Sequence, residues 1–157
     1  MPAFQKDNYK RSAGRTAKPR QTIEDGNEYE GEWDEKGQRD GYGLLFYKDG
    51  SCYEGYFEHN KTTGTGRLIK ANGDVINGQF VNGKTHGHAT FTAYDGSSVY
   101  TGVWENDLYH GQGKETLKDG STFVGSYVNG TKNGQGKFTW RDESTYEGGL
   151  EDGVMHG

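Results

Sequence analysis

The amino-acid sequence predicts an all-β protein made of tandem β-hairpins, and three observations support this fold class. A short motif returns six times at intervals of 23 or 24 residues. Within each copy, apolar and polar residues alternate along short segments, which is typical of strands with one buried face. Asp-Gly or Asn-Gly pairs separate most of these segments, and such pairs favour tight turns between antiparallel strands.

The returning motif has a leading ring, a glycine two residues later and usually a second ring after two more residues. Tyr29, Gly31 and Trp33 are its first copy. The further copies begin at Tyr53, Ile76, Tyr100, Phe123 and Tyr146. The sequence therefore predicts a repeat array over residues 23–157, with five full hairpins and a partial sixth from residue 146.

The spacing of the motif predicts which side chains share a face of the sheet. Residues two apart in a strand point the same way, so we expect Tyr29, Gly31 and Trp33 on one face. We expect Glu30 and Glu32 on the other face. A glycine between two rings also has a packing reason, because a neighbouring ring can lie flat over a position that has no side chain.

Two further landmarks complete each hairpin. A Gly-x-Gly pair such as Gly41-Tyr42-Gly43 precedes the second strand, and the third copy has Ala89 in place of the second glycine. The turn pairs are Asp49-Gly50, Asn72-Gly73, Asp95-Gly96 and Asp119-Gly120, and the fifth copy departs with Asp142-Glu143.

Composition limits the core. Leu, Ile, Val and Phe together number 23 of 157 residues, a share at which disorder is a common outcome. Aromatic residues make up 13% of the chain, however, and disordered chains are poor in them. A thick two-layer core is excluded, whereas a thin core of large rings fits the composition.

Charge is unevenly distributed along the chain. Residues 1–22 have a net charge of +5 and no periodic pattern, so we expect a basic arm without regular structure unless it is bound. The basic residues of this arm are Lys6, Lys10, Arg11, Arg15, Lys18 and Arg20. Such an arm has three alternative targets, which are anionic lipid, nucleic acid and acidic protein tails. The fourth alternative is that the arm is a solvated tail and binds none of them.

Tyr-Glu-Gly-x-Trp, a loop that often ends in His-Gly, and then Gly-x-Gly and Asp-Gly at this period resemble the MORN repeat over residues 23–157. The resemblance implies an elongated, single-layer, twisted antiparallel sheet with an aromatic-lined groove. It also implies a scaffold that binds protein partners and is not an enzyme. Similar arrays occur in ciliary radial spoke heads and other cytoskeletal scaffolds, so we expect a cytoplasmic component of a cilium or flagellum axoneme.

The predicted partner-binding residues are the rings of the groove, because an uncovered apolar stripe usually marks an interaction surface. They are Tyr29, Trp33, Tyr53, Phe57, Phe80, Tyr100, Trp104, Phe123, Tyr127 and Tyr146. Structural stacking is the alternative role for the same rings. The chain stops at Gly157 within a repeat, so we also expect either a fragment or association through the C-terminal sheet edge.

No catalytic, cofactor or metal site is predicted. Gly78, Gly83, Lys84 and Thr85 match the phosphate-loop spacing, but no helix pattern follows them. His86, His110 and His156 share one repeat position; equivalent positions lie about 10 Å apart, too far for two imidazoles to share a zinc ion. Cys52 has no basic neighbour to activate it.

Two other classes of function remain open from the sequence. The first alternative to the scaffold is a module that contacts anionic phospholipid at a membrane surface. The second is a regulatory segment of a larger enzyme. Nucleic acid is not an expected partner.

Overall fold

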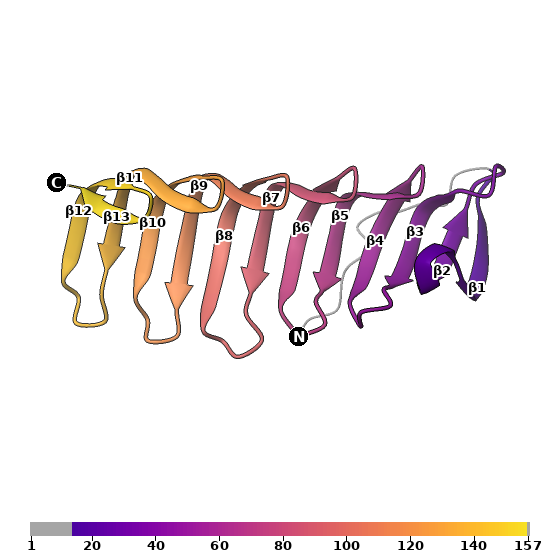
Figure 1. The fold of residues 1–157 in the computed structure, drawn as a ribbon, viewed down its shortest axis with the longest axis horizontal. Helices are drawn as coiled ribbons and strands as arrows, with labels where there is room; N and C mark the ends of the chain where they lie inside the picture. The colour runs from indigo at the N-terminus through magenta and orange to yellow at the C-terminus, as the bar shows by residue number, and fades with distance from the viewer. Residues whose placement is uncertain (1–13, 157) are drawn as a thin grey trace. The chain divides into compact units, whose positions relative to one another are not determined.

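A computed structural model describes residues 14–156, and their regular elements are thirteen β-strands and one turn of 3-10 helix, joined by turns (Figure 1). The chain divides into two compact units, Met1–Lys84 and Thr85–Gly157. In the first unit each strand from β1 to β6 pairs antiparallel with the next. The strands from β7 to β13 do the same in the second unit. The predicted all-β class of tandem hairpins is confirmed.

The strands are β1 (Thr16–Thr22), β2 (Glu28–Trp33), β3 (Arg39–Phe46), β4 (Cys52–Glu58), β5 (Lys61–Ile69), β6 (Val75–Val81), β7 (Lys84–Thr92), β8 (Ser98–Glu105), β9 (Leu108–Leu117), β10 (Thr122–Val128), β11 (Thr131–Thr139), β12 (Thr145–Glu151) and β13 (Val154–His156). The 3-10 turn, η1 (Glu24–Gly26), lies between β1 and β2.

Two kinds of turn alternate along the chain, and from the second copy on the shorter kind follows the second ring position of a copy. At His59-Asn60 it consists of two residues with φ of 50° and 67°. Asn106-Asp107 and Asn129-Gly130 have the same pair of left-handed residues. This backbone matches the twist of the strands on either side, which is why it is favoured in two-residue hairpins.

The Asp-Gly pairs form turns between antiparallel strands, as predicted, and they lie in the longer kind. At Asp49-Gly50 only the glycine has a positive φ, of 97°. The N–H of Gly50 donates to the carbonyl of Tyr47 at 3.0 Å, and the Asp49 carboxylate accepts the N–H of Ser51 at 2.8 Å. This is a turn closed by a left-handed glycine, which Asp-Gly suits equally well.

Glu32 is buried, which its predicted place on the polar face did not suggest. Glu30 is exposed as expected, whereas Glu32 is only 4% exposed. The pairing of β2 with β3 shifts between Gly31 and Trp33, on either side of this residue. The Glu32 carboxylate accepts the backbone N–H of Tyr42 at 2.9 Å, which satisfies a charge that would otherwise be buried alone.

The beginning of the array is also corrected. Residues 1–22 were expected to lack regular structure, but residues 16–22 form β1 and pair with β2. The sequence pattern did not predict this strand, because all seven residues of β1 are exposed and show no alternation of apolar and polar residues. Backbone pairing with β2 holds this strand, and the array therefore begins at Thr16 within the described residues.

Candidate functional site

The rings of the repeated motif meet edge to face, and we call this series of contacts the aromatic ladder. In the first unit the ring centroid of Tyr29 lies 5.0 Å from Trp33 and 5.1 Å from Phe57. Tyr53 lies 5.3 Å from Phe57 and 5.1 Å from Phe80. These ring planes meet at 81° to 86°, the arrangement that the ring quadrupole favours. The sheet face that carries the ladder is the ladder face, and the other is the opposite face.

The second unit repeats the ladder and adds a ring. Tyr100 lies 5.7 Å from Trp104 and 5.2 Å from Tyr127, again edge to face. Phe123 lies 5.6 Å from Tyr127. Tyr109, which the sequence did not single out, stacks parallel on Tyr100 at 3.7 Å. Rings of consecutive copies therefore contact one another on one face in each unit, and the spacing predicted that shared face.

Burial assigns most of these rings to the core and corrects their predicted role as a contact surface. Eight of the ten predicted rings are between 0% and 5% exposed, and Trp33 and Tyr146 are half-buried. The eight buried rings are Tyr29, Tyr53, Phe57, Phe80, Tyr100, Trp104, Phe123 and Tyr127. A partner that rests on the ladder face reaches almost none of their surface.

Glycines explain how one layer of sheet buries its own rings. Tyr29 packs directly on Gly43, and Tyr100 packs directly on Gly113. The hydroxyl of Tyr100 donates to the carbonyl of Val103 at 2.8 Å. Burial raises the pKa of Tyr100 to about 12. These phenols are neutral structural groups near pH 7.

One repeat position places a side chain over the leading ring of its own copy. The guanidinium of Arg39 lies 5.9 Å from the Tyr29 ring centroid, and the Lys132 ammonium lies 5.3 Å from that of Phe123. Tyr109 has the equivalent position over Tyr100. Sequence reasoning missed this position, although Arg39, Tyr109 and Lys132 do align when the copies are superimposed by their Gly-x-Gly pairs, because each lies two residues before the first glycine.

An acidic residue interrupts the ladder face of the second unit. Glu115 stands where the first two copies have Leu45 and Leu68. Its carboxylate accepts the hydroxyl of Tyr127 at 2.6 Å and pairs with Lys132 at 3.2 Å. Burial and this carboxylate both raise the pKa of Tyr127. We call Glu115, Tyr127 and Lys132 the polar clasp.

The first unit has a similar pair at its first ladder ring. Arg39 donates to Glu24 at 3.0 Å, and this bond lowers the pKa of the Glu24 carboxyl. Glu24 belongs to η1, so this ion pair fixes η1 to Arg39, whose guanidinium lies over the Tyr29 ring.

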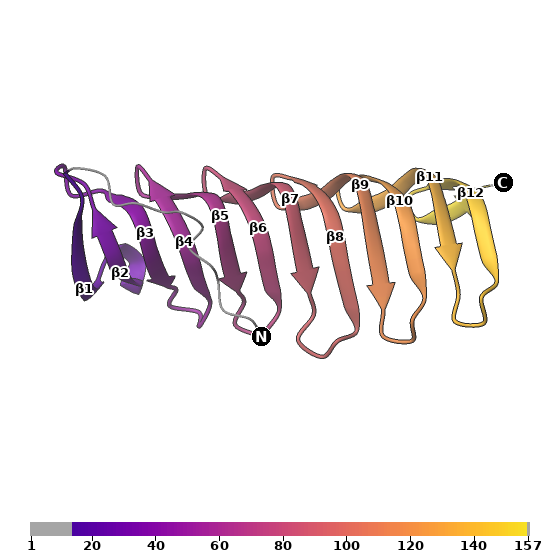
Figure 2. The ribbon, with the colours of Figure 1, turned by 180° about the vertical axis from the view of Figure 1, so that it is seen from behind.

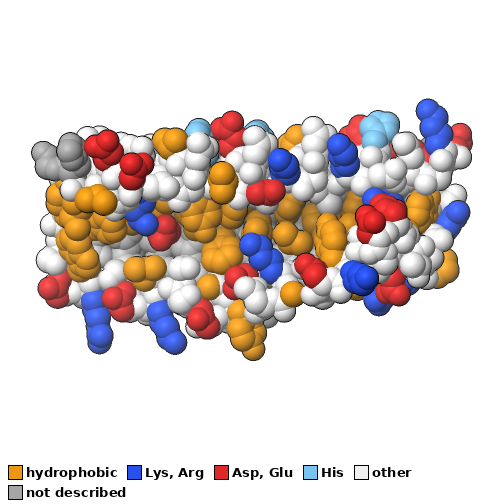
Figure 3. All heavy atoms as spheres, in the orientation of Figure 1, with side chains coloured by type: hydrophobic (Ala, Val, Ile, Leu, Met, Phe, Trp, Pro, Cys, Tyr) orange, Lys and Arg blue, Asp and Glu red, His pale blue; other side chains and the backbone are white. Residues whose placement is uncertain are grey.

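The ladder face of the second unit keeps an exposed apolar surface. Leu117 is 44% exposed and Trp140 is 37% exposed, at equivalent positions two strands apart. Trp140 stacks on the half-buried Phe138 with centroids 5.7 Å apart. We call Leu117, Phe138 and Trp140 the apolar patch. Figure 3 shows hydrophobic side chains gathered along the middle of this unit, between charged side chains at the strand ends.

The predicted basic arm divides into described and undescribed residues. Lys6, Lys10 and Arg11 lie outside the described residues. Arg20 pairs with Glu28 and lies 3.8 Å over the Phe46 ring, and Lys18 lies 5.9 Å over Trp33. These two charges contact the array itself.

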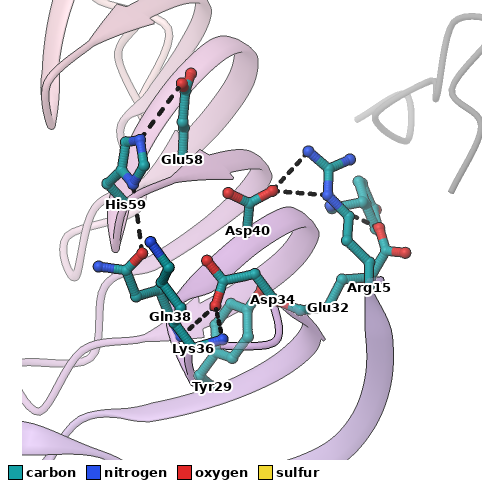
Figure 4. Close-up of polar contacts among 10 residues, drawn as sticks. Arg15, Tyr29, Glu32, Asp34, Lys36, Gln38, Asp40, Glu58 and His59 are labelled. Carbon is teal, nitrogen blue, oxygen red and sulfur yellow. Dashed lines mark hydrogen bonds and ion pairs between the residues drawn. The ribbon is translucent and has the colours of Figure 1, made fainter. Parts of the chain in front are cut away.

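Arg15 lies beside a polar pocket of about 380 Å³ at the hairpin ends of the first unit. Its guanidinium points at Asp40 in Figure 4, and its Nε donates to that carboxylate at 2.7 Å. On the far side of the pocket, His59 contacts the side-chain oxygen of Gln38 at 3.3 Å. Charges of both signs line the pocket, and the two pairs named here already satisfy one another.

The aligned histidines accept hydrogen bonds from the next hairpin. The N–H of Asn106 donates to His86 at 3.4 Å, and the N–H of Asn129 donates to His110 at 3.3 Å. In the described range, no three His, Cys, Asp or Glu side chains are grouped as a metal site would need. The side chain of His156 lies outside the described residues.

The phosphate-loop match has the wrong structure for phosphate. Gly78 lies in β6, and Lys84 begins β7 after a two-residue turn. A phosphate loop needs a helix whose N-terminus meets the phosphate groups, whereas this segment continues as a strand.

The matches of this chain to a known protein family coincide with its repeats. A family model described as "MORN repeat" matches residues 29–52, 53–75, 77–98, 100–122, 123–145 and 146–157. Among solved structures, the chain is similar to the TCP domain of SAS-4 (dCPAP) of Drosophila melanogaster, in complex with a proline-rich motif of Ana2 (dSTIL). That likeness has 14% identity and a TM-score of 0.39, over 92% of this chain and 70% of that one. Within residues 14–156, no helix has the length and apolar character to cross a membrane.

Proposed function

Because the chain belongs to the MORN-repeat family, we propose that it is a non-catalytic scaffold that binds a protein partner through the ladder face of its second unit. The observation that carries this proposal is the apolar patch. Leu117 and Trp140 together present exposed apolar surface on a face whose other rings are mostly buried. Exposed apolar surface of this kind marks protein interfaces, and tryptophan dominates their binding energy.

The polar clasp supports a protein partner over a purely apolar ligand. Glu115 and Lys132 remain 19% and 24% exposed and lie on the same face as the patch. A polar group at the edge of an apolar anchor gives an interface its register and specificity. Charged loop residues such as Lys118 and Arg141 directly follow Leu117 and Trp140, so a polar rim borders the patch.

The non-catalytic part of the proposal is supported by two carboxylates of the sheet that are already paired. Glu115 is held by Lys132 and Tyr127, and Glu54 accepts from Arg67 at 3.2 Å. Paired carboxylates of this kind stabilise a sheet. Association through a sheet edge remains a second part of the proposal, resting on the exposed Val154 and Met155 of β13.

The finer part of the proposal is a place in the axoneme of a cilium or flagellum. It is supported by the resemblance of an array of these repeats to radial spoke head components. The alternative of a lipid-binding arm has less support than the sequence suggested, because Arg15, Lys18 and Arg20 contact the array.

The test is recovery of partners with the tagged full chain from an extract of ciliated cells. Leu117→Ser with Trp140→Ser should abolish recovery of the partner that the wild-type chain retains. Val124→Ser, which changes an exposed apolar residue on the opposite face of the same unit, is the matched control and should recover it fully. Equal recovery of the partner by all three chains overturns the proposed surface. If microscopy of the tagged wild-type chain in the same cells shows none of it at the axoneme, the proposed location is overturned.

A further inference from the structure

Tyr94 is the one tyrosine of residues 14–156 that lies on the surface. It is 78% exposed, more than any other large hydrophobic residue of this range. The other described tyrosines are all buried or half-buried, and they are Tyr29, Tyr42, Tyr47, Tyr53, Tyr56, Tyr100, Tyr109, Tyr127 and Tyr146. The fold therefore separates Tyr94 from the tyrosines that build the sheet.

Several of the other tyrosines also have their hydroxyls held within the sheet. The hydroxyl of Tyr29 donates to the carbonyl of Glu32 at 2.8 Å, and that of Tyr146 donates to the carbonyl of Gly149 at 3.0 Å. An enzyme that acts on such a hydroxyl has to wait until the strands around it open, and packed strands open rarely. Tyr94 lies in a turn, so its hydroxyl is reached without this opening.

The turn that carries Tyr94 is longer than its counterpart in the next copy. It joins β7 to β8, and the N–H of Ala93 donates to the carbonyl of Ser98, five residues later, at 3.0 Å. In the next copy, the N–H of Leu117 donates to Ser121, four residues later, at 2.8 Å. Figure 2 shows the turn between β7 and β8 reaching beyond the corresponding turns of the second unit. The additional residue thus brings this segment forward from the sheet.

We propose that Tyr94 is a phosphorylation site, modified by a protein tyrosine kinase with ATP as the phosphoryl donor. In this step a new O–P bond forms between the phenol oxygen of Tyr94 and the γ-phosphorus of ATP. The bond from that phosphorus to the β,γ-bridging oxygen breaks, and ADP leaves with the oxygen. The phenol proton passes to a carboxylate base of the kinase.

A cation lies beside this turn and is placed to pair with the phosphate. The backbone N–H of Lys118 donates to the carbonyl of Ser97 at 3.1 Å, which joins the turn to that of the next copy. Hydrogen bonds from Ser97, and then the charge of Lys118, lower the pKa of the Asp95 carboxyl. A phosphate on Tyr94 adds a charge of about −1.5 to −2 next to Asp95, so the turn becomes strongly anionic.

The effect on binding rests on the proposed function of the apolar patch. Ala93, the neighbour of Tyr94, has the repeat position of Leu117, two strands or about 9.6 Å away. A partner that covers Leu117 and extends over this turn would have to take the phosphate out of water, which is unfavourable beside Asp95. Phosphorylation should therefore lower recovery of that partner by about fivefold or more.

The test of the site uses the full chain with Tyr9→Phe, so that every remaining tyrosine belongs to the described residues. The folded chain is treated with several soluble tyrosine kinases and Mg-ATP, and mass spectrometry locates the phosphate. Phosphate at Tyr94 should exceed that at all other tyrosines together by about tenfold or more, because the others depend on local opening. A tryptic digest treated in the same way should lose this preference, since the fold causes it.

Two variants in the same background complete the test. Tyr94→Phe should lose the phosphate of the folded chain. Tyr146→Phe removes a half-buried tyrosine of the same unit and is the matched control, so it should keep the phosphate. An absence of phosphate at Tyr94 of the folded chain, or a similar amount at the other tyrosines, overturns the site.

The effect on binding is measured by recovery of the partner with the phosphorylated and the untreated chain. Unchanged recovery overturns the regulatory effect of the phosphate and leaves the patch as the binding surface. Leu117→Ser with Trp140→Ser is measured in parallel. If that variant recovers the partner as well as the wild-type chain does, the proposed function fails, whereas the phosphate located at Tyr94 does not depend on that result.

Discussion

The ring of Tyr29 packs on Gly43 so closely that a Cβ added at residue 43 would stand 2.4 Å from the phenol oxygen. The same contact recurs between Tyr53 and Gly66. In the copy whose leading residue is Ile76, the second glycine is replaced by Ala89. Ring and glycine therefore form a matched pair, and the ring is buried because the glycine leaves it room.

The first prediction concerns this pair. Gly43→Ala should destabilise the protein by about 1–3 kcal/mol, because the added methyl overpacks the Tyr29 ring. Tyr29→Ile with Gly43→Ala, which copies the natural combination of the third copy, should be more stable than the sum of the single changes by at least about 0.5 kcal/mol. Urea unfolding of the four chains measures this coupling, and strict additivity would contradict the pairing.

The second prediction concerns the turn that lacks its glycine. Glu143 has a φ of 71° where the equivalent turn has Gly120 at 91°. Glu143→Gly should stabilise the protein by about 1 kcal/mol, since a left-handed residue with a Cβ costs ~1–2 kcal/mol. The melting temperature should rise by about 3 °C for a chain of this size. Glu143→Ala keeps the Cβ and removes the charge, so a similar rise in that control would assign the effect to charge instead.

The third prediction concerns the polar clasp. Lys132→Met alone leaves the Glu115 carboxylate with the Tyr127 hydroxyl and should cost about 1–2 kcal/mol, a figure reduced because both side chains keep some exposure to water. Glu115→Leu with Lys132→Met replaces the ion pair by apolar groups and should be close to neutral. Thermal unfolding of both variants is the measurement. If the double variant is the less stable of the two, the pair is a net source of stability.

The fourth prediction concerns alkaline pH. Burial raises the pKa values of Tyr29, Tyr53, Tyr100 and Tyr127 above the ordinary value of 10, that of Tyr100 to about 12. A raised folded-state pKa adds stability that is fully present below pH 10 and is lost as pH rises through the folded-state value. Stability should therefore fall between pH 10 and 12. Tyrosinate absorbance should rise together with loss of the sheet signal in circular dichroism, whereas full ionisation near pH 10 with the fold intact would rule out buried phenols.

Much of this fold follows from the sequence, because a motif of period 2 inside a repeat of 23 residues places strands, turns and shared faces. Tyr29 and Trp33 do contact each other, as their spacing predicted. The burial of Glu32 could not be predicted, because it depends on a register shift that only the paired strands define.

The sequence left two roles open for the rings, stacking and partner contact, and spacing alone could not decide between them. Spacing puts them on one face, but it does not say that they pack onto glycines of the neighbouring strand and against one another until eight of the ten are buried. Leu117 and Trp140 keep exposed surface on the same face, and this is a property of the packed unit that neither residue type reveals.

The most direct test of the proposed scaffold compares two residues of similar exposure on opposite faces of the second unit. A photo-crosslinking amino acid is placed at Leu117, 44% exposed on the ladder face, or at Val124, 48% exposed on the opposite face. After illumination in cells that express the full chain, a defined protein should be linked at residue 117 and not at residue 124. Equal linking at both residues, or a partner linked only at residue 124, would contradict a binding surface on the ladder face.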